Sequence, residues 1–259
     1  MDHAPVGSAD DRRSDAAQAS SFGQVAEDYA EHRPGYPDPA VRWALEPVAS
    51  RPHLTVLDLA AGTGKVTQAV RRIAVETVAV EPDPRLRAEF ARRVPGVRVL
   101  DGGAEALPLP DASVDAVTVG QAFHWFDAPR ALDEIARVLR PGGVVAALTN
   151  YNDDRWEWVA GLQRTGIPSP GISEEDPDYV PAHPRFAPVE TARFEHAHRR
   201  TADSLVRMIS THSWVLVQAP EEQERMRAEL RSYLAGRPET SSGEFDLPQV
   251  AVVNRAVRR

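Results

Sequence analysis

Short apolar runs alternate with amphipathic segments between residues 54 and 150, and this alternation constrains the fold more than any other feature. Five runs have the composition of buried strands: 54–60, 77–81, 96–102, 113–121 and 144–150. Three intervening segments carry apolar residues at helical spacing: 64–74, 83–94 and 127–140. Strands joined by helices pair in parallel, so the sequence predicts an α/β fold with a doubly wound, mostly parallel sheet. Ligands bind such sheets at the carboxyl ends of the strands.

The composition narrows the classes of function that are open to the chain. Its 259 residues suffice for one sizeable α/β domain, and its net charge is −8. Nucleic-acid binders usually carry a basic surplus, so this charge disfavours a nucleic-acid partner. The absence of cysteine excludes disulfides, thiolate zinc sites and a cysteine nucleophile. Without a long apolar run or a signal core, we expect a cytoplasmic protein with no membrane partner, as a monomer or homodimer.

The segment VLDLAAGTGKV, residues 56–66, resembles three kinds of nucleotide site. A Walker loop needs a Ser or Thr after its Gly-Lys pair, but Val66 follows Lys65, which is therefore interpreted as a solvated helix residue. A dinucleotide fingerprint needs a third glycine where Thr67 stands, and threonine would obstruct the close helix–strand packing. The third pattern, D-x-[GA]-x-G-x-G, fits the run from Asp58 to Gly64.

In this third pattern the backbone of the loop after the strand lies close to a ligand made of a nucleoside and an amino-acid tail. Gly62 and Gly64 would permit this close approach. An acid at the end of the second strand would accept hydrogen bonds from both ribose hydroxyls, and Glu81 stands there. A lone glycine most often marks a turn. The strand, acid, bend, helix, strand and second acid together are far more specific.

Residues 20–150 resemble the class I S-adenosylmethionine-dependent methyltransferases, within the type 11 or trans-aconitate methyltransferase-like group. Further matches are GGAEALPLPDASVDAVTVGQAFHW and RVLRPGG. The resemblance implies a seven-stranded Rossmann-like sheet and S-adenosyl-L-methionine as cofactor. It also implies that Pro82, Ala104 and Glu105 contact the cofactor, the last two beside its adenine. Two departures stand out: Ala60 replaces a glycine, which requires a negative φ, and Gly103 replaces an aspartate.

The segment YAEHRPGYP places Tyr29 and Arg33 four residues apart, on one face of an expected helix. Helical spacing alone fits a packed tyrosine and a surface arginine as well as a functional pair. The resemblance implies that both residues cap the cofactor pocket, with Arg33 pairing with the cofactor carboxylate.

The segment GQAFHWFD follows the fourth strand, where this fold places catalytic loops. Gln121 would line the methionine side of the cofactor. His124 would act as a general base or would orient a carboxylate, and Trp125 would form an aromatic wall near the sulfonium. A purely structural His–Trp pair remains an alternative, and Asp127 would cap the next helix.

His196 and His198 have the spacing of metal ligands on a strand. A solvated strand face is the favoured interpretation, and no metal site is predicted.

The domain organisation follows from these assignments. We expect residues 1–20 to form a disordered leader and residues 21–259 a single methyltransferase domain. Within it, 21–50 would form a helical cap, 51–150 the cofactor-binding core, and 151–259 the lid helices and last two strands. The Pro-rich, acidic stretch from Thr165 to Pro188 is interpreted as a lid.

The leading hypothesis is therefore a methyltransferase acting on a small molecule, at a carboxylate or another oxygen. One alternative is an RNA methyltransferase, which the acidic balance disfavours. Another is a non-catalytic protein that binds S-adenosylmethionine.

Overall fold

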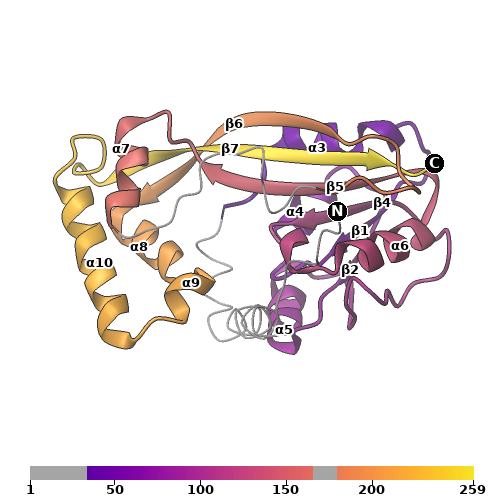
Figure 1. The fold of residues 1–259 in the computed structure, drawn as a ribbon, viewed down its shortest axis with the longest axis horizontal. Coiled ribbons are helices and arrows are strands. Elements are labelled where there is room, and N and C mark those ends of the chain that lie inside the picture. The colour runs from indigo at the N-terminus through magenta and orange to yellow at the C-terminus, as the bar shows by residue number, and fades with distance from the viewer. Residues whose placement is uncertain (1–33, 166–179) are drawn as a thin grey trace, which may run out of the picture.

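The computed structural model describes residues 34–165 and 180–259, which form a seven-stranded sheet flanked by helices (Figure 1). In spatial order the strands are β3 (Arg98–Leu100), β2 (Glu76–Val80), β1 (Thr55–Leu59), β4 (Val114–Gly120), β5 (Leu139–Asn152), β7 (Glu244–Val257) and β6 (Glu190–Thr201). The first five are parallel, whereas β7 runs antiparallel to both β5 and β6. The predicted doubly wound, mostly parallel sheet is confirmed.

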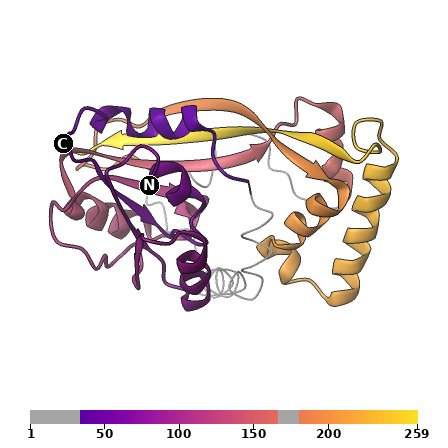
Figure 2. The same cartoon turned by 180° about the vertical axis from the view of Figure 1, so that it is seen from behind.

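Helices cover both faces of the parallel part of the sheet. They are α3 (Asp38–Leu45), α4 (Lys65–Val70), α5 (Pro84–Arg93) and α6 (Ala128–Val138), with short 3-10 turns η2 (Glu46–Val48) and η3 (Phe123–Trp125). Helix α6 packs on the side chains of Leu57 and Val117, whereas α3 and α4 pack on the opposite face, which carries Val56 and Ala116. Figure 2 shows α3 lying across β5 and β7.

Capping residues fix where the helices begin. The carboxylate of Asp83 accepts hydrogen bonds from the N–H groups of Arg85 and Leu86. Asp127 caps α6, as predicted. An aspartate directly before Pro39 predicts an N-cap at Asp38. Instead Pro37 occupies that position and Asp38 is the first helical residue. Its carboxylate pairs with Arg72 at 2.5 Å.

Strands β5, β6 and β7 extend past the parallel strands and carry a second group of helices, which we call the helical lobe (Figure 1). Its members are α7 (Glu157–Ala160), η4 (Gly161–Thr165), α8 (Ala202–Ser210), α9 (Ser213–Leu216) and α10 (Pro220–Ala235). The lobe has its own apolar core, in which Trp158, Leu205 and Leu234 pack on Phe245 and Leu247 of β7. Residues 202–216 are divided between the helices α8 and α9, and Thr211 at the break donates to the carbonyl of Met208 at 2.6 Å.

Within 34–165 and 180–259, no helix combines the length and apolar character that crossing a bilayer requires. The expected lid at 165–188 falls largely on residues 166–179, which lie outside the described ranges.

Candidate functional site at the carboxyl ends of β1 and β4

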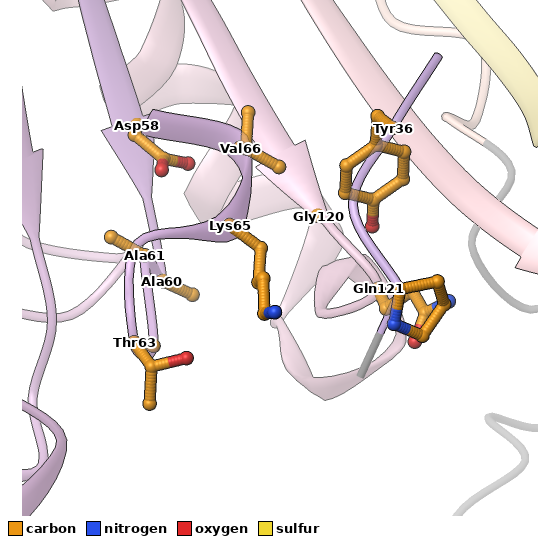
Figure 3. Close-up of a pocket in the computed structure, with 11 residues that line it drawn as sticks. Tyr36, Asp58, Ala60, Ala61, Thr63, Lys65, Val66, Gly120 and Gln121 are labelled. Carbon is orange, nitrogen blue, oxygen red and sulfur yellow. The ribbon is translucent and has the colours of Figure 1, made fainter. Parts of the chain in front are cut away.

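A pocket opens where the sequence predicted a ligand, at the carboxyl ends of β1 and β4 (Figure 3). The space between its lining atoms, including the part open to solvent, is about 440 Å³. Its lining residues are Pro34, Tyr36, Asp58, Ala60, Ala61, Gly62, Thr63, Lys65, Val66, Gly120 and Gln121. The fold therefore brings four of the predicted site residues together: Asp58, Ala60, Gly62 and Gln121.

The bend between β1 and α4 is built from left-handed backbone. Ala60, Gly62 and Gly64 have φ values of 53°, 55° and 88°. The expectation of a negative φ at Ala60 is therefore wrong. A Cβ added to Gly62 would meet no atom within 4 Å, whereas one added to Gly64 would lie 2.5 Å from Cγ2 of Val94. Gly62 thus borders open space, and Gly64 is required for packing against α5 and the residue that ends it.

Asp58 is fully buried at the end of β1, beneath the pocket. Its Oδ2 accepts a hydrogen bond from Oγ1 of Thr67 at 2.5 Å. Its Oδ1 is buried and has no hydrogen-bond partner among the described residues. Burial raises the pKa of the Asp58 carboxyl from 3.8 to about 7. Thr67 does not fit a dinucleotide fingerprint, but its hydroxyl holds the carboxylate of Asp58, the acid in the D-x-[GA]-x-G-x-G pattern.

Glu81 follows β2 and is joined to the glycine bend. Its Oε2 accepts from the backbone N–H of Gly62 at 2.8 Å, and its Oε1 accepts from that of Asp83 at 2.9 Å. Arg87 donates to the carbonyl oxygens of Glu81 and Pro82 at 2.7 Å, which fixes the backbone here. Burial raises the pKa of the Glu81 carboxyl. Each carboxylate oxygen retains a lone pair for a further donor, and Pro82 is exposed beside it.

Lys65 lines the pocket, so its interpretation as a solvated helix residue is wrong. Figure 3 shows its side chain extending from the start of α4 into the pocket, between Thr63 and Gln121. Burial, together with the positive charges of Arg93 and Arg200, lowers the pKa of its ammonium group from 10.5 to about 8. The sequence does contain one indication that Lys65 lines the pocket. Lys65 directly follows Gly64, the last glycine of the bend, where α4 begins beside the strand ends.

Ala104 and Glu105 lie in a tight turn after β3, closed by a bridge between Gly103 and Ala106. Ala104 is buried, and Oε1 of Glu105 accepts from the backbone N–H of Asp127 at 2.9 Å. Glu105 thus ties this turn to the loop that follows β4.

Gln121, His124 and Trp125 follow β4 in one short loop. Gln121 has a φ of 51°, lines the pocket, and donates through Nε2 to the carbonyl of Asn150 at 3.3 Å. His124 is exposed in η3, and its ring centroid lies 4.4 Å from that of Trp125. Neither ring is among the described residues that line the pocket.

Tyr29 and Arg33 lie outside the described residues. The segment that follows them does reach the site, since Pro34 and Tyr36 line the pocket. The hydroxyl of Tyr36 donates to the carbonyl of Leu148 at 3.1 Å, which anchors this segment to β5.

Comparison with known proteins agrees with this geometry. A methyltransferase-domain family profile matches residues 57–147. A methyltransferase of Mycobacterium tuberculosis is 36% identical over 237 residues, covering 91% of this chain and 95% of that protein. A malonyl-[acyl-carrier protein] O-methyltransferase of Pectobacterium atrosepticum is 34% identical over 119 residues, covering 43% of this chain and 47% of the relative.

Among solved structures, one from Anaeromyxobacter dehalogenans, described as a type II methyltransferase, superposes with a TM-score of 0.66 and 28% identity. The match covers 87% of this chain and 97% of that one. The chain belongs to the class I methyltransferases. It is a methyltransferase with a Rossmann-like fold, as its resemblance to the group predicted.

Proposed function

We propose that this protein transfers the methyl group of S-adenosyl-L-methionine to a carboxylate or another oxygen of a small molecule. The observation that carries the proposal is the pairing of two buried acids across the glycine bend. Asp58 lies at the end of β1 with one oxygen unsatisfied, and Glu81 lies after β2 with its carboxylate held by Gly62.

The acceptor and charged groups at this site complement the polar groups of the cofactor. The Glu81 carboxylate would accept the two hydroxyl protons of an unphosphorylated ribose. Oδ1 of Asp58 would accept from the cofactor ammonium, which explains an otherwise unpaired buried oxygen. Lys65 would pair with the cofactor carboxylate, a role that the sequence had suggested for Arg33 alone.

Gly62, Ala104 and Gln121 are assigned to the cofactor from their positions after β1, β3 and β4. Gly62 borders open space, so the cofactor can approach its backbone closely. The buried turn at Ala104 would face the adenine. Gln121 would lie along the methionine side, because it borders the pocket opposite Ala60 (Figure 3).

The bound cofactor supplies an electrophilic methyl group on a sulfonium, and the protein must align an acceptor oxygen with it and exclude water. A carboxylate acceptor is already ionised at neutral pH and needs no general base. We therefore assign His124 an orienting role and Trp125 an aromatic wall beside the reacting groups. The name of the Pectobacterium relative, an O-methyltransferase, supports oxygen as the acceptor atom.

The test is mass spectrometry of a panel of small carboxylic acids, alcohols and amines incubated with the full chain and S-adenosylmethionine. A mass gain of one methylene group on an acid or alcohol, absent with Glu81→Ala, is expected. Methylation confined to amines or to added bulk RNA would overturn the acceptor assignment. Calorimetry that detects no binding of S-adenosylmethionine would overturn the cofactor assignment.

A further inference from the structure

One face of the three long strands changes from apolar to polar and back to apolar along its length. Under α3 and α4 it carries Leu148, Ala251 and Val253, and under the helical lobe it carries Phe245 and Leu247. Between these two regions lie five polar residues, which we call the polar band: Asn150, Asn152, His196, His198 and Gln249.

The strand register places the polar band on a single face. Asn152 is opposite Gln249, which is opposite His196, and His198 is opposite Leu247 of the lobe core. Directly opposed residues in antiparallel strands point to the same side of a sheet. A polar strip between two apolar cores is expected where a sheet borders a ligand rather than a helix.

The hydrogen bonds within the polar band are incomplete. Nε2 of His196 lies 3.0 Å from Oδ1 of Asn150, and Nε2 of Gln249 donates to Oδ1 of Asn152 at 3.3 Å. However, Oε1 of Gln249 and Nδ1 of His198 are buried with no hydrogen-bond partner in the described parts of the chain. The Gln249 side chain is only 4% exposed. Unpaired buried polar atoms cost roughly 1–3 kcal/mol each, which a bound ligand would recover.

The polar band begins where the cofactor pocket ends. The Asn150 carbonyl accepts from the side chain of Gln121, which lines that pocket. The Asn150 side chain donates to the carbonyl of Gly35 at 3.0 Å, between the pocket residues Pro34 and Tyr36. A molecule lying along the band would therefore reach the methionine end of the cofactor pocket.

The charge around the polar band favours an anion. Arg200 is buried on the same face of β6 as His198, and its Nη2 lies 3.1 Å from Sδ of Met208. Together with burial, the positive charges of Arg200 and Lys65 lower the pKa of His198 to about 4. Positive neighbours also oppose binding of a metal cation at the His196–His198 pair. No cluster of three or more metal-ligating side chains occurs within 34–165 and 180–259.

We propose that the polar band is the acceptor site, and that His198, Gln249 and Arg200 hold an anionic group of the acceptor, namely a carboxylate. This inference rests on the proposed function, because it names the molecule to which the methyl group would be passed. Neutral His198 would donate one N–H, Gln249 would orient a polar neighbour of the carboxylate, and Arg200 would supply the charge.

The test uses the full chain with labelled histidine and follows the imidazole resonances by NMR. The probes are the dicarboxylates succinate and glutarate, each matched by its neutral diamide. We expect the acids to shift the His198 signals and to raise the pH at which His198 titrates, because a bound anion favours the imidazolium. The diamides should leave these signals unchanged.

Variants separate this site from the cofactor pocket. His198→Gln and Arg200→Lys should weaken dicarboxylate binding at least ten-fold, with the affinity for S-adenosylmethionine unchanged by calorimetry. His53→Gln, in the exposed turn before β1, and Arg193→Gln, on the exposed face of β6, are matched controls that should bind like the wild type.

The acceptor assignment is overturned if neither acid shifts His198 up to tens of millimolar, if the diamides act equally, or if His198→Gln binds the acids normally. A wild-type chain that binds the acids at His198 but not S-adenosylmethionine would instead refute the proposed function while supporting the anion site.

Discussion

The backbone N–H of Gly62 donates to the carboxylate of Glu81 at 2.8 Å, so the bend after β1 and the acid after β2 form a single unit. Parallel pairing creates this contact, because Leu59 is opposite Val80 and the two strands end side by side. A change in either residue will therefore disturb the position of the other.

Replacing Glu81 with glutamine should weaken binding of S-adenosylmethionine by about ten- to a hundred-fold. The amide loses the negative charge, and its NH₂ group would face a second donor, either the N–H of Gly62 or that of Asp83. Calorimetry measures the effect. Glu76→Gln, at the exposed start of the same strand, is the control and should retain wild-type affinity. Unchanged affinity in Glu81→Gln would refute the ribose assignment.

The affinity for S-adenosylmethionine should rise with pH, on the order of ten-fold between pH 6 and 7.5. The pKa of Asp58 is about 7 in the free protein, and only the ionised carboxylate attracts the cofactor ammonium. Burial also raises the pKa of Glu81, which acts in the same direction. Asp58→Asn should bind more weakly with a flatter pH profile, and a profile as steep as that of the wild type would contradict the role of Asp58.

Without cofactor, the same group should give stability the opposite pH dependence. A carboxyl whose folded-state pKa is raised contributes stability that is full below its unfolded pKa of 3.8 and is lost as pH rises through about 7. The free energy of unfolding should fall by about 1–2 kcal/mol between pH 5.5 and 8. Urea denaturation of the wild type and Asp58→Asn at both pH values tests this. The expected result is a decline in the wild type that is clearly smaller in the variant, because the raised pKa of Glu81 still contributes in both.

The two glycines of the bend should respond differently to alanine. Gly64→Ala places a Cβ 2.5 Å from Cγ2 of Val94 at a φ of 88°, and should destabilise the fold by about 2–4 kcal/mol. Gly62→Ala meets no atom within 4 Å, so its main effect should be on cofactor affinity, with a loss of stability near 1 kcal/mol. Chemical denaturation and calorimetry on both variants separate the effects. Equal losses of stability would contradict this division.

His124→Gln should lower kcat by about ten-fold and leave the affinity for S-adenosylmethionine unchanged. An orienting side chain contributes less than a general base, whose removal costs roughly 10²–10⁴-fold. Once an acceptor is identified, steady-state kinetics with His53→Gln as the matched control gives the answer. A loss above a hundred-fold would assign proton transfer to His124, and no loss would make it structural.

The sequence predicted the parallel part of the sheet and the bend after β1 well because their signals are local. Glu81 and Gly62 are specified by the ends of consecutive strands, and parallel pairing brings such ends together. Ala60 shows the limit of this approach, because the left-handed φ of 53° is imposed by the bend and contradicts the preference of alanine. The position of Lys65 in the pocket lining was not predicted, because the mismatch to the Walker pattern says nothing about where the first turn of α4 points.

The proposed acceptor half was not apparent because it depends on long-range register. His198 and Gln249 lie far apart in sequence and share a face only because β6 pairs antiparallel to β7. The sequence of residues 190–200 is compatible with a strand, but it does not indicate which face of that strand would be covered. That depends on the helical lobe, whose position follows from the length of the strands and not from any local motif.

The uninterrupted run of β5, β6 and β7 into the helical lobe has a consequence for how this enzyme can diverge. Ladder hydrogen bonds, rather than a hinge, set the spacing between the parallel part of the sheet and the helical lobe. Lengthening or trimming the turns between α8, α9 and α10 would reshape the helical lobe while the bend after β1 and its contact with Glu81 keep their geometry. Changes in the helical lobe can therefore accumulate without altering the bend after β1 and the acid after β2.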